Sequence, residues 1–252
     1  MKKLLLVVLA LSSSISAQAA IINVGGVHWD PEQGLAFPAL TDFVANGTIF
    51  EDVAVNPGDI VTGRGEVTHV NSAVTNQGIF CPGCELTFHF EMELVSFVGA
   101  PTGVGGSIDG DFTFKDLVID FMVDDTPEFD GTMPTATDGD LWLRLALPFG
   151  EFLTGTGDNL GSGSDSGTGT ALMDVMGGLA AANFDTNTQA GGADMVLSSS
   201  FQPTAGDPNT LNGTFDLTGN SIAVPEPSAL ALLGAAFLGF VRLFGRRSTE
   251  QV

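Results

Sequence analysis

The stretch from Glu85 to Leu94 alternates strictly between apolar and polar side chains. The apolar set is Leu86, Phe88, Phe90, Met92 and Leu94, and the polar set is Glu85, Thr87, His89, Glu91 and Glu93. A repeat of two over ten residues is the pattern of a β-strand with one buried face and one solvated, acidic face. The chain is therefore expected to build at least one sheet with a buried side.

Further segments predict more strands. A second strand is expected over Leu141–Pro148, and a third begins at Phe112 and continues as a nearly unbroken apolar run over Leu117–Val123, as in a strand covered on both sides. Weaker candidates are Ile60–Val70, Met195–Phe201 and Thr214–Ser221. Asn46-Gly47 and Asn212-Gly213 favour type I′ hairpin turns, because both residue types tolerate positive φ. Together these signals predict an all-β, jelly-roll-like antiparallel β-sandwich in a single domain.

Two segments depart from the strand pattern. Leu172, Val175, Met176 and Leu179 have helical spacing, which predicts one short helix, although Gly177-Gly178 disfavours it. Before it, residues 155–170 include the Gly/Ser-rich run 161–169, which is typical of a flexible loop. We expect a loop inside one β-rich domain over residues 20–223, rather than a boundary between two lobes.

The body of the chain is strongly acidic. Of the eight basic residues, five lie at the two ends, which leaves Arg64, Lys115 and Arg144 against 28 acids and a net charge near −25. This charge argues against binding to nucleic acids, because that affinity comes from Lys and Arg neutralising phosphates. It favours solubility outside the cell and resistance to self-association. Acidic polysaccharides are expected to bind only through bridging divalent cations.

The N-terminus has the three parts of a secretory signal peptide. Lys2 and Lys3 give the positive start, Leu4–Leu11 is the apolar core, and Ala17-Gln18-Ala19 is a cleavage site of the A-x-A type. The apolar core is too short to span a bilayer, which takes roughly 20 residues. We therefore expect residues 1–19 to be removed on export.

The C-terminus carries a second targeting pattern. Val224-Pro225-Glu226-Pro227 precedes an apolar helix expected at about 228–244, and Arg246-Arg247 follow it. The prolines favour a helix start just after them, and the arginines suit the cytoplasmic side of a membrane. This end resembles the PEP-CTERM sorting signal of Gram-negative bacteria. The resemblance implies that a membrane enzyme, an exosortase, processes the protein near Pro-Glu-Pro. An ordinary C-terminal membrane anchor that is never cut is the alternative.

Cys81 and Cys84 are the only cysteines. In an exported chain, a local disulfide that closes the Pro82-Gly83 turn is favoured. A redox pair, and a zinc site built from Cys81, Cys84, His69 and His89, are the alternatives. The segment Phe80–Phe88 also resembles other members of the same exported group, and that resemblance implies no particular activity.

Aspartates recur at the ends of predicted strands. Their carboxylates are hard oxygen ligands of the kind that calcium prefers, although none of them follows the EF-hand spacing. The candidate calcium ligands are Asp109, Asp111, Asp124, Asp125, Asp138 and Asp140. The alternative is that these are exposed acids in turns.

Enzyme signatures are missing from the sequence. It contains no G-x-S-x-G, P-loop, G-x-G-x-x-G or H-E-x-x-H motif. His28-Trp29-Asp30 is either a sugar-stacking spot or a packed aromatic at a strand end. No enzyme activity, and no catalytic residue, is therefore expected.

The sequence as a whole predicts an exported protein at the cell surface or in the extracellular space, held in the inner membrane transiently or stably by its C-terminal helix. Its expected partners are the exosortase, the secretion machinery and the membrane. The leading hypothesis is a structural or adhesive role in exopolysaccharide or a biofilm. A calcium-dependent carbohydrate-binding module and a secreted hydrolase are the alternatives.

Overall fold

The computed structural model describes residues 21–31, 41–71, 79–102, 106–161, 164–204 and 207–222. One compact unit ends at Ile222, and a second comprises Ala223–Val252, which lies outside the described residues. The predicted signal peptide with its Ala17 and Ala19 cleavage site, the sorting motif and the membrane helix also lie outside them. Among the described residues, no helix has both the length and the apolar character needed to cross a membrane.

Strands make up most of the first unit. In chain order, the elements are β1 (Ile22–Val24), β2 (Val27–Trp29), β3 (Phe43–Asp52), β4 (Ile60–Val70), β5 (Glu85–Pro101), β6 (Ile108–Asp124), α2 (Met133–Ala136), β7 (Asp140–Ala146), β8 (Leu153–Leu160), β9 (Ser166–Gly177), α3 (Ala181–Phe184), a 3₁₀ turn (Ala190–Gly192), β10 (Met195–Thr204) and β11 (Asp207–Gly219). Every pairing between these strands is antiparallel. The prediction of an all-β, antiparallel fold is therefore confirmed.

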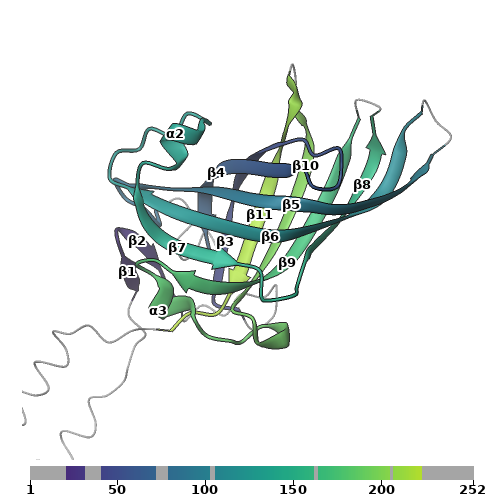
Figure 1. Cartoon of the computed structure of the whole chain (residues 1–252). Coiled ribbons are helices and arrows are strands. Elements are labelled where there is room, and N and C mark those ends of the chain that lie inside the picture. Colours follow the sequence, from purple (N-terminus) through teal and green to yellow (C-terminus); the bar gives the residue numbers. More distant parts are fainter. Residues whose placement is uncertain are drawn as a thin grey trace, which may run out of the picture. The chain divides into compact units, whose positions relative to one another are not determined.

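The large sheet closes on itself. Its strands follow the order β10-β11-β3-β4-β5-β6-β7-β9-β8, and β9 also pairs with β10. The long strand β6 pairs with β8 along its first half and with β7 along its second half, so β7 and β8 occupy one strand position end to end. Figure 1 shows the strands wrapped around a common interior. The two walls expected of a sandwich are thus opposite sides of one continuous sheet.

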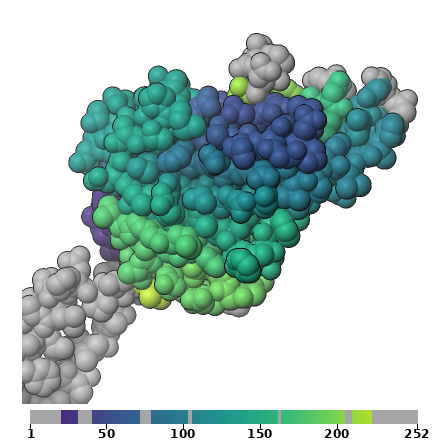
Figure 2. All heavy atoms as spheres, in the orientation of Figure 1, coloured from purple at the N-terminus to yellow at the C-terminus, as the bar shows by residue number. Residues whose placement is uncertain are grey.

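The alternating segment of the sequence forms the centre of this wall. It lies in β5, which runs for 17 residues from Glu85 to Pro101, and its apolar side chains face the interior. β6 is equally long and pairs with β5 along its whole length, with register shifts at Glu91/Glu93 and Leu94/Ser96. Seen from the side, these strands contribute to a continuous outer surface of side chains (Figure 2).

Both predicted hairpin turns are wrong. Asn46-Gly47 lies within β3 and Asn212-Gly213 lies within β11. Each glycine is needed for a close approach between neighbouring strands: a Cβ on Gly47 would lie 2.0 Å from the Glu66 carbonyl oxygen, and one on Gly213 would lie 1.7 Å from that of Ser200. An Asn-Gly pair can therefore mark either a hairpin turn or a glycine inside a strand where another backbone approaches closely.

The predicted helix and flexible loop are also corrected. Residues 172–177 belong to strand β9, where pairing with β10 and then with β7 outweighs the local helical spacing. Most of 155–170 belongs to β8 and β9, whose small side chains allow the two strands to pair closely, with Gly155 opposite Gly169. Among the residues that the structure describes, the short α-helices are α2 and α3.

One end of the closed sheet is filled by an aromatic plug. Trp29 of β2 is fully buried and stacks on Phe184 of α3 with a centroid distance of 5.0 Å. Its ring also contacts Phe43 and Trp142 edge-on, at 5.9 and 6.0 Å. The Trp29 Nε1–H donates a hydrogen bond to Ser221 Oγ at 2.9 Å, which satisfies the polar atom that burial would otherwise leave unpaired. The last described residue, Ile222, lies at this end, where its N–H donates to the Asn183 carbonyl.

Candidate functional site: an apolar cavity inside the closed sheet

Beyond the plug, the interior opens into a cavity of about 1300 Å³. Its floor is a layer of three rings, in which Phe88 lies 5.4 Å from Phe121 and 4.6 Å from Phe215 between centroids. Side chains of Ile49, Val61, Phe90, Met92, Ile119, Leu153 and Leu197 line its walls. Eight strand positions enclose an interior that is either just filled by side chains or holds one small ligand. In this protein, side chains do not fill the half of the interior that lies beyond the floor.

Glycines on the inward faces shape this cavity. Gly63 of β4 lies directly opposite Phe90 of β5, and a Cβ on the glycine would stand 2.1 Å from the ring. Gly167 of β9 lies opposite Phe201 of β10 with the same 2.1 Å clearance. Because the glycines have no side chains, the rings lie against the neighbouring strand instead of extending across the interior.

A second group of aromatic rings forms a cluster in the half of the cavity nearer the mouth. Phe97 and Phe112 lie 4.9 Å apart between centroids, and Phe112 also contacts Phe114 and Phe201. All four rings are only partly buried and all line the cavity. The β3–β4 connection contributes Val53, Ala54 and Val55 at the same end. The mouth therefore presents a mostly apolar entrance at the end opposite the plug.

Glu51 is the inward-facing carboxylate at this mouth. It follows Phe43, Ala45, Gly47 and Ile49 on the inward row of β3, and it lines the cavity. Burial raises the pKa of the Glu51 carboxyl to about 7, and the negative charge of Asp52 adds to the increase. Sequence reasoning missed this residue, although extending the period of two from Phe43 places it on the inward face.

The charge around the cavity has one sign. Of the described residues that line it, the charged ones are Glu51, Asp52 and Asp165, and all three are acids. Asp52 is exposed, and its Oδ2 accepts a hydrogen bond of 2.6 Å from Thr62 Oγ1. The potential at the entrance is therefore negative, which disfavours anionic ligands.

The cavity has the general features of a small-molecule site. Such sites are concave and mainly apolar, with a few placed polar groups, and usually measure roughly 300–1,000 Å³. The volume here is slightly larger, and the lining combines many apolar side chains with two partly buried carboxylates, those of Glu51 and Asp165. Its chemistry is that of binding and shielding an apolar molecule from water.

The predicted calcium ligands are only partly brought together. Asp124 and Asp138 lie with Glu128 so that one carboxylate oxygen of each is within 4.8 Å of the others. Glu128 was not predicted, because it follows no strand end that the sequence reveals. Asp111 is 13 residues from Asp124 on the same strand, about 40 Å at about 3.3 Å per residue, so neither it nor Asp109 reaches this group. Asp125 and Asp140 are exposed and do not belong to it.

Glu85 lies beside this acidic group. It pairs with Asp124 across β5 and β6, and its Oε2 accepts hydrogen bonds from the backbone N–H groups of Glu128 and Phe129 at 3.1 and 3.0 Å. Its Oε1 is buried and makes no hydrogen bond among the described residues. Partial desolvation raises the pKa of Glu128, and the charges of Asp138 and Asp124 add to it. Three carboxylates this close repel one another unless a proton or cation lies between them.

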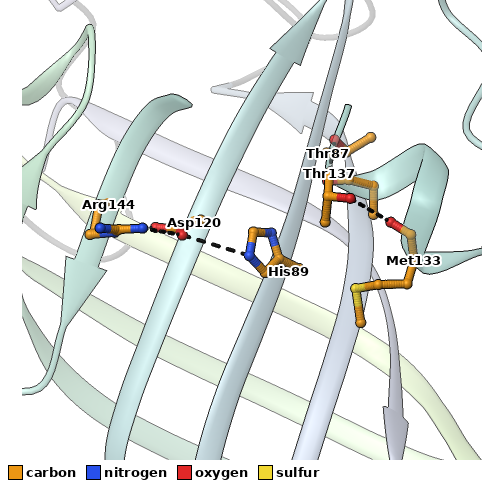
Figure 3. A network of polar contacts seen from close by, with 7 residues as sticks. Thr87, His89, Asp120, Met133, Thr137 and Arg144 are labelled. Carbon is orange, nitrogen blue, oxygen red and sulfur yellow. Dashed lines mark hydrogen bonds and ion pairs between the residues drawn. The ribbon is translucent and has the colours of Figure 1, made fainter. Parts of the chain in front are cut away.

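A row of charged side chains crosses the outer face of the same wall (Figure 3). Arg144 of β7 makes two hydrogen bonds of 2.6 Å with the Asp120 carboxylate of β6. His89 of β5 is the next residue in register, with its Nε2 3.6 Å from Asp120 Oδ2. The hydrogen bonds and charge of Asp120 raise the pKa of Arg144. The row joins three neighbouring strands and has no connection to the cavity interior, so we assign it a structural role.

The remaining candidates have structural roles. Cys81 and Cys84 form a disulfide, so neither sulfur is a thiolate ligand for zinc. Trp29 is fully buried in the plug, which places its ring out of reach of a sugar. Of the two interpretations of His28-Trp29-Asp30, packing is therefore the correct one.

Comparison with known proteins identifies one segment. No curated protein and no solved structure matches the chain. Residues 223–247 match the PEP-CTERM protein-sorting motif, which agrees with the resemblance seen at Val224-Pro225-Glu226-Pro227 and Arg246-Arg247. The chain therefore carries the sorting signal of an exported exosortase substrate.

Proposed function

We propose that this exported protein is a non-enzymatic binding protein that holds an elongated apolar molecule inside its closed sheet. The observation that carries the proposal is the cavity of about 1300 Å³, which has Phe88, Phe121 and Phe215 at its floor and a cluster of four phenylalanines nearer its mouth. Each methylene group buried there contributes roughly 0.8 kcal/mol of transfer free energy. An alkyl chain of moderate length thus gains enough to offset the cost of association.

The placement of the mouth supports this function for a sorted protein. The mouth is formed by the connections β3–β4 and β8–β9, whereas Ile222, after which the sorting segment begins, lies at the plugged end. The mouth and Ile222 therefore lie at opposite ends of the closed sheet. The closed sheet and its core lie wholly before Ala223, so this unit is complete without that segment.

A neutral fluorescent probe, diphenylhexatriene, tests the proposal on the unit comprising residues 20–222. Ser199 points into the cavity and its neighbour Ser198 is exposed on the outer face of the same strand. We expect saturable binding by the wild type and by Ser198→Trp, and binding weaker by about tenfold or more in Ser199→Trp, whose indole occupies the cavity. Circular dichroism confirms that both variants fold. Absence of saturable binding in the wild type, or equal binding by both variants, would contradict the proposal.

The wider role of the sorted protein remains structural or adhesive, in exopolysaccharide or a biofilm. The support is the sorting motif together with the acidic body, which suits a hydrated matrix bridged by divalent cations. Deletion of the protein should weaken matrix cohesion, and fractionation should recover it at the cell surface. Recovery from the cytoplasm alone, or an unchanged matrix, would count against this role.

Calcium-dependent carbohydrate binding is a second candidate, and one observation favours it. Asp124, Glu128 and Asp138 bring three carboxylates within 4.8 Å, with the buried Glu85 beside them. This is the type of oxygen-rich group that calcium selects. The site lies by α2 at the outer edge of the sheet, so it would act separately from the cavity. The described residues give no support to the third alternative, a secreted hydrolase.

A further inference from the structure

We infer that the cavity selects an amphipathic ligand with an apolar tail and a cationic amine head, and that Glu51 is the carboxylate that binds this head. The inference rests on the proposed function, because it names the chemical class of ligand for the same cavity. It is carried by the position of one carboxylate on the inward face, at the boundary between an apolar interior and an acidic mouth.

The neighbours of Glu51 leave its carboxylate without a protein cation. Its cross-strand partners are Gly63 on β4, which has no side chain, and Leu211 on β11, which is apolar. Arg64, the next residue on β4, lies on the opposite face, and its Nε–H donates to the Gly131 carbonyl at 2.5 Å. None of these neighbouring residues therefore supplies a positive charge to the Glu51 carboxylate, and a cationic ligand can supply it.

The charged groups that line the cavity with Glu51 have the same sign. Asp52 follows it on β3, and Asp165 approaches the cavity from the β8–β9 connection. The other described residues that line the cavity carry no charge, among them Gln202, Pro203 and Thr204 of β10. Asp52 beside Glu51, and Asp165 elsewhere in the lining, repel an anionic head group and attract a cationic one. At this position an amine head group therefore increases the affinity of the ligand, whereas the carboxylate of a fatty acid would decrease it.

The ionisation of Glu51 makes the preference measurable. Burial, and then the charge of Asp52, raises its pKa to about 7, so the free protein is partly protonated near neutrality. An ammonium head favours the ionised carboxylate and lowers this pKa on binding. Below about pH 7, amine binding must therefore release a proton from Glu51, and affinity for the amine must rise as pH increases through this range.

The length of the cavity matches a head at the mouth and a tail toward the floor. Glu51 is four residues along β3 from Gly47, the position beside the Phe215 floor ring, which corresponds to about 13 Å at about 3.3 Å per residue. A straight alkyl chain can extend over this distance while its head stays beside the carboxylate. The head group can thus contact Glu51 while the apolar tail of the same ligand packs near the floor.

Three probes of equal tail length test the inference: dodecylamine, dodecanol and dodecanoate, each competing with diphenylhexatriene below the concentration at which it aggregates or reaches its solubility limit. We expect the amine to bind most tightly and the carboxylate most weakly, with about tenfold or more between them, as one charge-assisted contact provides. Glu51→Gln should weaken binding of the amine by about this tenfold factor and leave the affinity for dodecanol unchanged. Glu91→Gln, which neutralises an exposed acid on the outer face of β5, is the matched control.

Measurements at several pH values complete the test. In the wild type, amine affinity should increase from about pH 6 to about pH 8, and calorimetry in buffers of different ionisation enthalpy should detect the released proton. Glu51→Gln should abolish both effects. Equal binding of amine and carboxylate, or an unchanged amine affinity in Glu51→Gln, would overturn the inference. If none of the three probes binds, the proposed function itself fails, which is a different result.

Discussion

The ring of Phe90 lies over Gly63, its cross-strand partner, so closely that a Cβ on the glycine would stand 2.1 Å from two ring atoms. The same Cβ would also stand 2.9 Å from the Phe50 carbonyl oxygen, which belongs to the backbone of the neighbouring strand. The contact between Phe90 and Gly63 keeps the ring against the sheet, and the space beyond it belongs to the cavity. The cavity is thus a consequence of where the glycines lie as much as of where the phenylalanines lie.

Gly63→Ala should consequently destabilise the protein. Replacing a glycine with alanine usually stabilises a protein where the backbone conformation permits it, because the substitution lowers the conformational entropy of the unfolded chain. Here overpacking against Phe90 should reverse the sign and lower the free energy of unfolding by about 1–3 kcal/mol, measured by urea denaturation. Gly177→Ala is the control, since a Cβ there meets nothing within 4 Å. Equal stability of Gly63→Ala and the wild type would show that the ring is not held in this way.

The stability of the protein should depend on the ionisation of Glu51. Its pKa is about 7 in the folded state, above its usual value, so the folded protein holds this proton more tightly than the unfolded chain does. This contribution is fully present below about pH 4.5 and is lost as pH rises through 7. We expect about 2 kcal/mol across this range, reduced from the full linkage value because the group is partly exposed.

The comparison of wild type with Glu51→Gln isolates this contribution. Burial also raises the pKa of Asp42 and of Glu66, so the total slope has several sources, and only the difference between the two proteins reports on Glu51. Urea denaturation at about pH 4.5, about pH 6 and about pH 8 provides the measurement. Parallel curves for the two proteins would exclude a perturbed carboxyl at this position.

Calcium should stabilise the fold through the acidic group near α2. At millimolar calcium we expect the melting temperature to rise by about 3 °C, the shift that a site of moderate affinity gives in a domain of this size. Glu128→Gln should lose the calcium effect and, because it removes repulsion with Asp124 and Asp138, should melt slightly higher in chelator.

The control for this prediction is Asp111→Asn, which alters an acid on the distant half of β6 and should keep the full calcium response. A response that is the same in Glu128→Gln and the wild type would place calcium elsewhere. If calcium changes the melting temperature of none of these proteins, the three carboxylates do not bind calcium and a shared proton reduces their repulsion instead.

Local patterns predicted the strands well and their assembly poorly. The alternation at Leu86–Leu94 identified β5 because one face of that strand is buried, which is a property of the residues themselves. Closure of the sheet depends on the pairing of β9 with β10 and on the division of β6 between β7 and β8. These pairings join distant segments, and no local signal records them. The sequence therefore predicted the fold class but not the cavity.

Ambiguous residues account for the remaining errors. Asn46-Gly47 has the composition of a hairpin turn, but Gly47 is required beside the Glu66 carbonyl and the Phe215 ring. Glu51 and Asp52 look like a solvated acidic end of a strand, and only the inward row that begins at Phe43 shows that Glu51 faces the interior. By contrast, the sorting motif is a contiguous signal, so the sequence alone was sufficient to identify it.

The most direct test of the cavity as a binding site is native mass spectrometry of the protein released from the host cell surface. We predict a bound small molecule that is lost on denaturation, and whose occupancy is preserved in Ser198→Trp but abolished in Ser199→Trp. A bare polypeptide mass in the wild type, or the same adduct in both variants, would contradict the account.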